Sequence, residues 1–228
     1  MTDIETLRNE LSELDLKIIE LVHRRQVLSE EIGAIKRKKG RPTRDYQREK
    51  LVIELAKSHA KELNVDPEMV VDLMQLLIQS SLKTQESARV KEEGQGNGKR
   101  ALVIGGLGRM GGWFAEFMSM QGYEVHIADI NIQEEDESHF NSWRDTDDNY
   151  DITVLATPLR QSIEILENIL ESGRRGIIFD IASIKSPIKE LLKEISDKGM
   201  KVTSIHPMFG PDTDLLTGKH VVFMNIDS

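Results

Sequence analysis

The sequence has no cysteine, few aromatic residues and no long apolar run, and each absence excludes a class of protein. Without cysteine there can be no disulfide framework, thiol nucleophile or cysteine-bound metal. No apolar stretch approaches the roughly 18 residues of a membrane span, and the N-terminus lacks a signal-peptide pattern. The six histidines are scattered without ligand spacing, so we predict no metal site. Together these observations predict a cytoplasmic protein with no membrane contact.

Charge divides the 228-residue chain into two parts. Residues 1–90 carry 16 basic and 16 acidic residues, whereas the remainder carries 14 and 23 and so holds the whole formal net charge of −9. Within the neutral part, residues 23–50 hold ten Lys and Arg against four Asp and Glu. This stretch is a solvated helix end, a nucleic-acid surface or a site for a small polyanion, and no aromatic interleaving supports the nucleic-acid interpretation.

The first part opens with an apolar repeat that alternates steps of three and four residues, which is typical of a helix with a heptad seam. It predicts one helix of about ten turns over residues 4–39. The seam is interrupted by Arg25, and Lys36 lies eleven residues on, at nearly the same face. Two cations on an apolar face cost stability unless an anionic group pairs with them. They form interhelical salt bridges, extend their charged ends to the edge of the face, or bind a ligand. The seam comprises Ile4, Leu7, Leu11, Leu14, Ile18, Leu21, Leu28, Ile32 and Ile35.

Two shorter helices follow, from about residue 44 to 63 and from Pro67 onward. Three helices in ninety residues make a poor core, so the exposed seam predicts pairing with a second copy. Arg8 lies about 25 Å before Arg25 along the first helix and on a different face, so it can reach only the partner's site. On the second helix, one face carries Asp45, Arg48 and Glu49, which are either site residues or a cluster of surface ion pairs. On the third helix, Ser81 and Gln85 are either site residues or core polar groups with satisfied hydrogen bonds.

The segment from Leu7 to Gln85 resembles the all-helical chorismate mutases. The match rests on Leu7-Arg8, Arg24-Arg25, Lys36, Arg41-Pro42-Thr43-Arg44-Asp45 with Arg48-Glu49, and Ser81 with Thr84-Gln85. The resemblance implies an intertwined homodimer that rearranges chorismate to prephenate and borrows Arg8 from the partner. Arg8 and Arg25 would bind the two carboxylates, Lys36 and Gln85 the ether oxygen, and Glu49 the ring hydroxyl, with Asp45, Arg48 and Ser81 as supporting contacts.

A polar, glycine-rich linker over residues 91–99 separates this part from residues 100–228. An apolar strand at 101–104 then leads into a glycine loop, a helix to about Gln121 and a second strand at 124–128 that ends at Asp129. This order favours dinucleotide binding over a glycine-rich turn without a cofactor. Asp129 would accept from the ribose hydroxyls and repel a 2′-phosphate, which favours NAD over NADP. The loop has G-x-G-x-x-G at Gly106, Gly108 and Gly111, with Leu107, Arg109 and Met110 between them.

Four more strands are predicted at 152–156, 176–180, 201–205 and 220–224, alternating with helices near 161–171 and 187–198. Residues 130–150 are acidic and without periodicity, so we expect a surface loop or a small, weakly ordered element there. The alternation predicts a doubly wound parallel sheet with its chemistry at the carboxyl ends of the strands, where Thr157, Ser183 and His206 lie. The structural alternatives are a helix-capping role for Ser183 and a backbone-bonded loop histidine for His206.

Residues 100–224 resemble the prephenate dehydrogenase family through the glycine loop, residues 180–185 and the run from His206 to Asp212. Mutase followed by dehydrogenase is similar to the bifunctional enzymes of tyrosine biosynthesis, on the shikimate pathway of aromatic amino acids. The resemblance implies NAD-dependent oxidative decarboxylation of prephenate to 4-hydroxyphenylpyruvate, with His206 taking the ring hydroxyl's proton and Ser183 orienting it. That family continues into an all-helical domain that closes the prephenate pocket, whereas this sequence stops at Ser228. We therefore expect NAD binding but little prephenate oxidation by these residues.

Two alternatives stay open. One is a mutase with a non-catalytic NAD-binding domain. The other is an NAD-sensing regulator whose helical part binds nucleic acid, which requires a basic surface face, whereas Arg25 and Lys36 fall on the apolar stripe.

Overall fold

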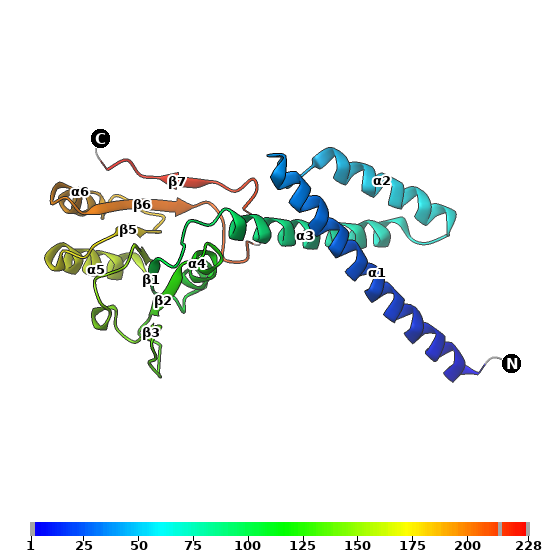
Figure 1. Ribbon diagram of the computed structural model, residues 1–228, viewed down its shortest axis with the longest axis horizontal. Coiled ribbons are helices and arrows are strands. Elements are labelled where there is room, and N and C mark those ends of the chain that lie inside the picture. The colour runs from blue at the N-terminus through cyan, green and yellow to red at the C-terminus, as the bar shows by residue number, and fades with distance from the viewer. Residues whose placement is uncertain (1–2, 214–215, 227–228) are drawn as a thin grey trace. The chain divides into compact units, whose positions relative to one another are not determined.

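The computed structural model describes residues 3–213 and 216–226, and the chain divides into two compact units, Met1–Arg89 and Val90–Ser228 (Figure 1). The first unit is helical and the second is an α/β unit, which confirms the predicted fold class. No helix within the described residues is long and apolar enough to cross a membrane.

The helical unit consists of α1 (Ile4–Lys38), α2 (Tyr46–Glu62) and α3 (Pro67–Glu92). Helix α1 ends where Gly40 adopts a φ of +60°, which a residue with a side chain rarely does. Asp45 caps α2 by accepting a hydrogen bond from the backbone N–H of Arg48 at 3.0 Å. Helix α3 runs past Gln85 as far as Glu92, into the segment predicted as a linker.

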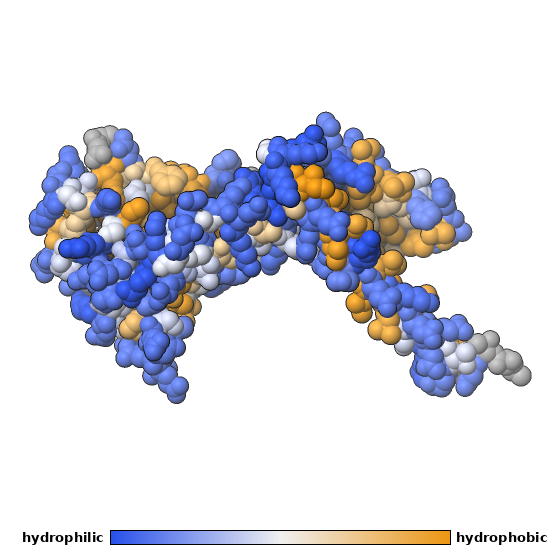
Figure 2. Space-filling model, in the orientation of Figure 1, coloured by the Kyte–Doolittle hydropathy of each residue, from blue (hydrophilic) through white to orange (hydrophobic). Residues whose placement is uncertain are grey.

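The apolar seam of α1 is exposed in the single chain. Leu21 is 69% exposed and Leu11 60%, and only Ser29 and Gly33 of this helix are buried. Figure 2 shows apolar side chains gathered on the surface of the helical unit. A water-facing apolar stripe of this length is unfavourable for an isolated chain.

The second unit is a seven-stranded sheet in the order β3-β2-β1-β4-β5-β6-β7. The pairs β2–β1, β1–β4, β4–β5 and β5–β6 are parallel, as predicted. The strands are β1 (Arg100–Ile104), β2 (Glu124–Ala128), β3 (His139–Phe140), β4 (Ile152–Leu155), β5 (Ile177–Asp180), β6 (Lys201–Pro207) and β7 (Val221–Phe223). A short 3₁₀ helix spans Trp143–Asp145.

Helices cover both faces of this sheet: α4 (Arg109–Met120), α5 (Leu159–Ser172) and α6 (Lys189–Asp197). Leu102 and Leu155 pack with residues of α5 and α6, whereas Val103 and Val154 pack with residues of α4. Successive strand residues thus face opposite layers, and both layers are apolar. This arrangement explains why the central strands are continuous apolar runs rather than alternating ones.

Two details differ from the sequence prediction. Strand β7 pairs antiparallel with β6. A parallel pair needs a long crossover, usually a helix, and residues 208–213 and 216–220 of this connection form no helix. A two-residue strand, β3, also lies inside the segment predicted as a surface loop and extends the sheet beside β2.

Candidate active site and nucleotide site

Arg25 is half-buried between α1 and α3. Its Nη1 donates to the carbonyl oxygen of Leu77 at 2.7 Å and to the hydroxyl of Ser81 at 2.6 Å. The Ser81 hydroxyl donates in turn to the same Leu77 carbonyl at 2.8 Å. Burial lowers the pKa of Arg25. Within the described residues Arg25 forms no ion pair, so its guanidinium is oriented by neutral groups alone.

Gln85 lies one turn beyond Ser81 on α3 and is 6% exposed. Its Nε2 donates to the hydroxyl of Ser29 on α1 at 2.6 Å. Its Oε1 is buried and has no partner in the described part of the chain. The structure therefore brings Arg25, Ser81 and Gln85 together where α1 crosses α3 (Figure 1).

Lys36 and the residues after it form a second polar group at the connection from α1 to α2. The ammonium of Lys36 donates to the carbonyl oxygen of Thr43 at 2.6 Å. The guanidinium of Arg44 forms two hydrogen bonds of 3.1 Å to the two carboxylate oxygens of Glu49. Sequence analysis missed this ion pair, although the five-residue spacing of the two side chains at a helix start was a usable signal.

Arg8 is not part of this cluster in its own chain. Its guanidinium is exposed and forms an ion pair of 2.7 Å with Glu5, one turn earlier on α1. Arg48 is also exposed, and its backbone N–H is bound by the Asp45 cap. One chain therefore supplies Arg25, Ser81 and Gln85 to one cluster and leaves Arg8 outside it.

The glycine loop of the second unit joins β1 to α4. An added Cβ at Gly105 would lie 2.8 Å from the carbonyl oxygen of Ala156, and one at Gly106 would lie 2.5 Å from Cγ2 of Ile127. One at Gly111 would meet the carbonyl oxygen of Gly105. The glycines thus let the loop lie close against β2 and α4 against the loop, which is the cradle that a dinucleotide pyrophosphate needs at a helix N-terminus.

Asp129 follows β2 and lies beside this loop. Its Oδ2 accepts from the backbone N–H of Leu107 at 3.1 Å, and its Oδ1 accepts from the backbone and side-chain nitrogens of Asn131. Thr157 borders the loop from β4, because an added Cβ at Gly105 would lie 3.0 Å from its Cγ2. Its hydroxyl is hydrogen-bonded to Ser162 at 2.8 Å. The residues predicted to bind the nucleotide thus lie in the glycine loop or directly beside it.

Residues 207–213, which follow His206, dock on α4. Arg109 forms an ion pair of 2.7 Å with Asp212, and Trp113 Nε1 donates to the carbonyl oxygen of Thr213 at 3.0 Å. The rings of Trp113 and Phe209 have centroids 5.0 Å apart. The sequence did not predict these contacts. They join α4, the helix that follows the glycine loop, to the segment that follows His206.

His206 is half-buried at the end of β6, where it pairs with Val222. Ser183 is exposed in the connection after β5. No hydrogen bond joins their side chains within the described residues, but Lys185 links their segments. Its ammonium donates to the carbonyl oxygen of Ile205 at 2.7 Å and to Asp180 Oδ1 at 3.3 Å. Burial lowers the pKa of Lys185, and the Asp180 carboxylate opposes that shift.

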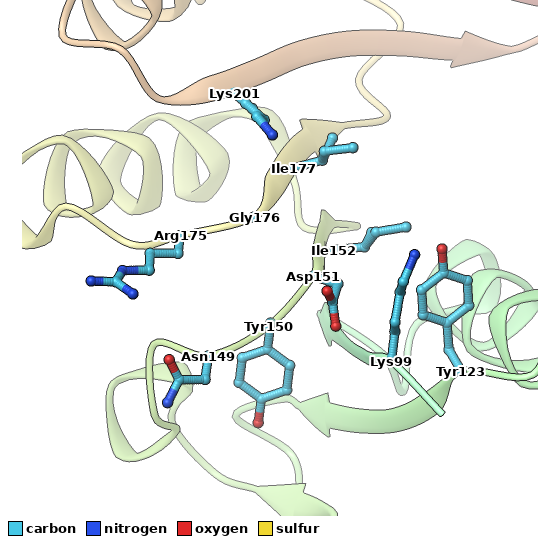
Figure 3. Close-up of a pocket in the computed structure, with 10 residues that line it drawn as sticks. All are labelled: Lys99, Tyr123, Asn149, Tyr150, Asp151, Ile152, Arg175, Gly176, Ile177 and Lys201. Atoms are coloured by element: carbon cyan, nitrogen blue, oxygen red, sulfur yellow. The ribbon is translucent and has the colours of Figure 1, made fainter. Parts of the chain in front are cut away.

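A hollow of about 490 Å³ lies elsewhere, at the amino ends of the strands (Figure 3). It contains none of the predicted site residues, because those of this unit lie at the opposite, carboxyl ends of the strands. In the described part of the chain no group of three His, Asp or Glu side chains is placed to hold a metal ion. The hollow is lined by Lys99, Tyr123, Asn149, Tyr150, Asp151, Ile152, Arg175, Gly176, Ile177 and Lys201.

Comparison with known proteins also divides the chain into a helical part and an α/β part. Residues 7–86 match the family model for type II chorismate mutase, and residues 115–225 match that for the nucleotide-binding domain of prephenate dehydrogenase. A "T-protein" of Haemophilus influenzae is 24% identical over 224 residues, which cover 97% of this chain and 56% of that protein. The chain therefore spans little more than half the length of that relative.

Two relatives from Methanocaldococcus jannaschii match one part each. A chorismate mutase is 31% identical over 94 residues, which cover 41% of this chain and 93% of that protein. A probable arogenate/prephenate dehydrogenase is 30% identical over 128 residues, covering 53% of this chain and 29% of that protein. The chain belongs to the chorismate mutase family, and after the helical unit it carries a segment that matches the nucleotide-binding domain of prephenate dehydrogenase.

Proposed function

We propose that the helical unit rearranges chorismate to prephenate in the cytoplasm. The observation that supports this most is Arg25, a half-buried cation that neutral hydrogen bonds orient and that forms no ion pair among the described residues. A ligand carboxylate is the group that such a site accommodates. Arg25 and Lys36 donate to α3 and to Thr43 rather than facing outward, which argues against a nucleic-acid surface.

The reaction is pericyclic: the ether C–O bond breaks as a new C–C bond forms, so it needs no nucleophile, general base or cofactor. The protein must hold a dicarboxylate in a compact conformer and stabilise the charge that develops on the ether oxygen. Arg25 would bind one carboxylate, and Lys36 and Gln85 would donate to the ether oxygen. Glu49, oriented by its two hydrogen bonds from Arg44, would accept from the ring hydroxyl.

The proposed enzyme is a homodimer that pairs the apolar seams of α1. Exposed Leu and Ile side chains along the whole helix support this proposal. The two copies of Arg8 would then each serve the partner's site as the second carboxylate ligand, because Arg8 lies outside its own chain's cluster. Asp45 and Arg48 support the site by fixing the start of α2.

The role of Gln85 is tested by the pH dependence of a Gln85→Glu variant. An ionised carboxylate cannot donate to the ether oxygen, and it repels the developing negative charge. We therefore expect the variant to lose most mutase activity near neutral pH and to recover part of it in acid, as the carboxyl becomes protonated. Steady-state assays between pH 4 and 8 measure this, with the wild type as reference, and a flat profile would exclude Gln85 as the donor.

We further propose that the second unit binds NAD in preference to NADP and belongs to an NAD-dependent prephenate dehydrogenase. The glycine cradle and the position of Asp129 support this. NAD, when bound, accepts a hydride from the substrate, and CO₂ leaves the oxidised ring. His206 would take the ring hydroxyl's proton, and Ser183 would orient it. Thr157 and the loop residues would contact the dinucleotide.

Asp129→Asn is expected to narrow the preference for NAD over NADP by about ten-fold or more, because it removes a charge that repels the 2′-phosphate while keeping an acceptor oxygen. Calorimetric titration of the 228-residue chain with each nucleotide measures the ratio. Glu167→Gln, on the exposed side of α5, removes the same charge elsewhere and should leave the ratio unchanged. An unchanged ratio in Asp129→Asn would contradict the assignment of Asp129.

A further inference from the structure

Ser29 lies one helical turn after Arg25 on α1, and Gln85 lies one turn after Ser81 on α3. The two helices therefore form two successive polar contacts, from Arg25 to Ser81 and from Ser29 to Gln85, at 2.6 Å each. Ser29 is 9% exposed. A buried hydroxyl needs a hydrogen-bond partner, and the partner of the Ser29 hydroxyl is Gln85, a residue of the candidate site.

Gly33, one turn further along α1, makes room for the Gln85 side chain. An added Cβ at this position would lie 2.7 Å from Cγ of Gln85 and 3.2 Å from its Cδ. Any side chain at position 33 would therefore push the amide away from α1. Gln85 is held by contact with the bare helix backbone on one side and by the Ser29 hydroxyl at one end of its amide.

The other end of the amide is the unusual feature. Oε1 of Gln85 is buried without a partner among the described residues, and an unpaired buried acceptor costs free energy. A half-turn about the Cγ–Cδ bond exchanges Oε1 and Nε2. The contact with Ser29 survives that turn, because a hydroxyl can donate as well as accept. After it, Ser29 donates to the amide oxygen, and the N–H₂ group lies where Oε1 lies now.

We propose that Ser29 is a positioning residue of the mutase: its hydroxyl donates to the Gln85 amide oxygen when substrate is bound, so that the N–H₂ group of Gln85 faces the substrate and one of its N–H bonds donates to the ether oxygen. This inference rests on the mutase function proposed above. An ether oxygen that gains negative charge is stabilised by a hydrogen-bond donor. In the structure, the end of the Gln85 amide that is not bound to Ser29 is the acceptor Oε1. Ser29 itself does not touch the substrate, and Gly33 provides the space in which the amide turns.

The pH profile of the Gln85→Glu variant tests this donation directly. If the Ser29 hydroxyl donates to the group at position 85, it stabilises the carboxylate of Glu at that position and lowers its pKa. Adding Ser29→Ala removes this stabilisation, so the pKa rises. Because the protonated form is the active one, the midpoint of the acid recovery should move to higher pH, by about one unit for a hydrogen bond to a charged group.

Ser80→Ala in the same Gln85→Glu background is the matched control. Ser80 also lies on the α1–α3 interface, where it accepts a hydrogen bond of 3.3 Å from Gln26 rather than contacting Gln85. We expect no shift of the midpoint in this control. A loss of packing alone would lower activity in both double variants without moving either midpoint.

The single variant Ser29→Ala gives a second measurement if the double variant does not fold. With Gln85 intact, we expect kcat to fall about ten-fold while KM is nearly unchanged, since a donor that acts mainly in the transition state is misplaced. The inference is overturned if Gln85→Glu recovers in acid but Ser29→Ala leaves its midpoint where it was, or if Ser29→Ala alone leaves kcat unchanged. Absence of any acid recovery in Gln85→Glu would instead count against the proposed role of Gln85.

Discussion

Arg25→Ala is expected to lower kcat/KM for chorismate about a thousand-fold, because it removes an oriented carboxylate ligand in a site where contacts act together. In the ligand-free protein this cation is half-buried and forms no ion pair among the described residues. In the proposed site, the substrate carboxylate would offset the cost of burying this charge. Because no charged group among the described residues pairs with Arg25, we expect activity and stability to respond differently to its removal.

Arg25→Met makes that difference measurable. The substitution replaces a half-buried cation by an apolar side chain of similar length, which is often neutral or stabilising when no buried partner charge is left behind. We expect the free energy of unfolding in urea to stay within about 1 kcal/mol of the wild type, while activity is lost as in Arg25→Ala. Arg24→Ala, which removes an exposed neighbour, is the control for net charge. Retained activity in Arg25→Ala would contradict the site.

Mixing inactive Arg8→Ala with inactive Arg25→Ala is expected to restore activity. If each site combines Arg25 of one chain with Arg8 of the other, a mixed dimer contains one site with both arginines and one with neither. Random refolding of equal amounts makes half of the dimers mixed, so about a quarter of the wild-type sites should be active.

Each variant refolded alone provides the baseline for this experiment, and differently tagged chains allow the mixed dimer to be isolated. The isolated mixed dimer should then have about half of the wild-type activity, since one of its two sites is intact. No activity in the isolated mixed dimer would show that Arg8 serves its own chain or none. That outcome would leave the assignment of Arg25 in place.

Features determined by neighbouring residues could be predicted from the sequence. The start of α3 at Pro67 follows from local turn chemistry, and the structure begins that helix there. The glycine loop and Asp129 could be found because β1, α4 and β2 have distinct periodicities. The close approach of Gly106 to Ile127 then explains why that loop needs glycine.

Features that depend on packing between distant elements could not be predicted. Ser29 has the pattern of a solvated helix residue until the rotation of α1 against α3 places it 2.6 Å from Gln85. The docking of Thr213 on Trp113 joins residues a hundred positions apart, and no local pattern specifies it. The direction of β7 likewise depends on the path of residues 208–220, which sequence periodicity does not determine.

The most direct test of the account is an assay of chorismate consumption by the purified 228-residue chain, with a chelator present and no nucleotide added. We expect rapid, stoichiometric formation of prephenate, with specific activity that falls on dilution as the α1 seams separate. NAD should leave the rate of this step unchanged, because the rearrangement requires no cofactor. Conversion no faster than the spontaneous reaction at concentrations where the chain is dimeric would contradict the central claim that this helical unit is a chorismate mutase.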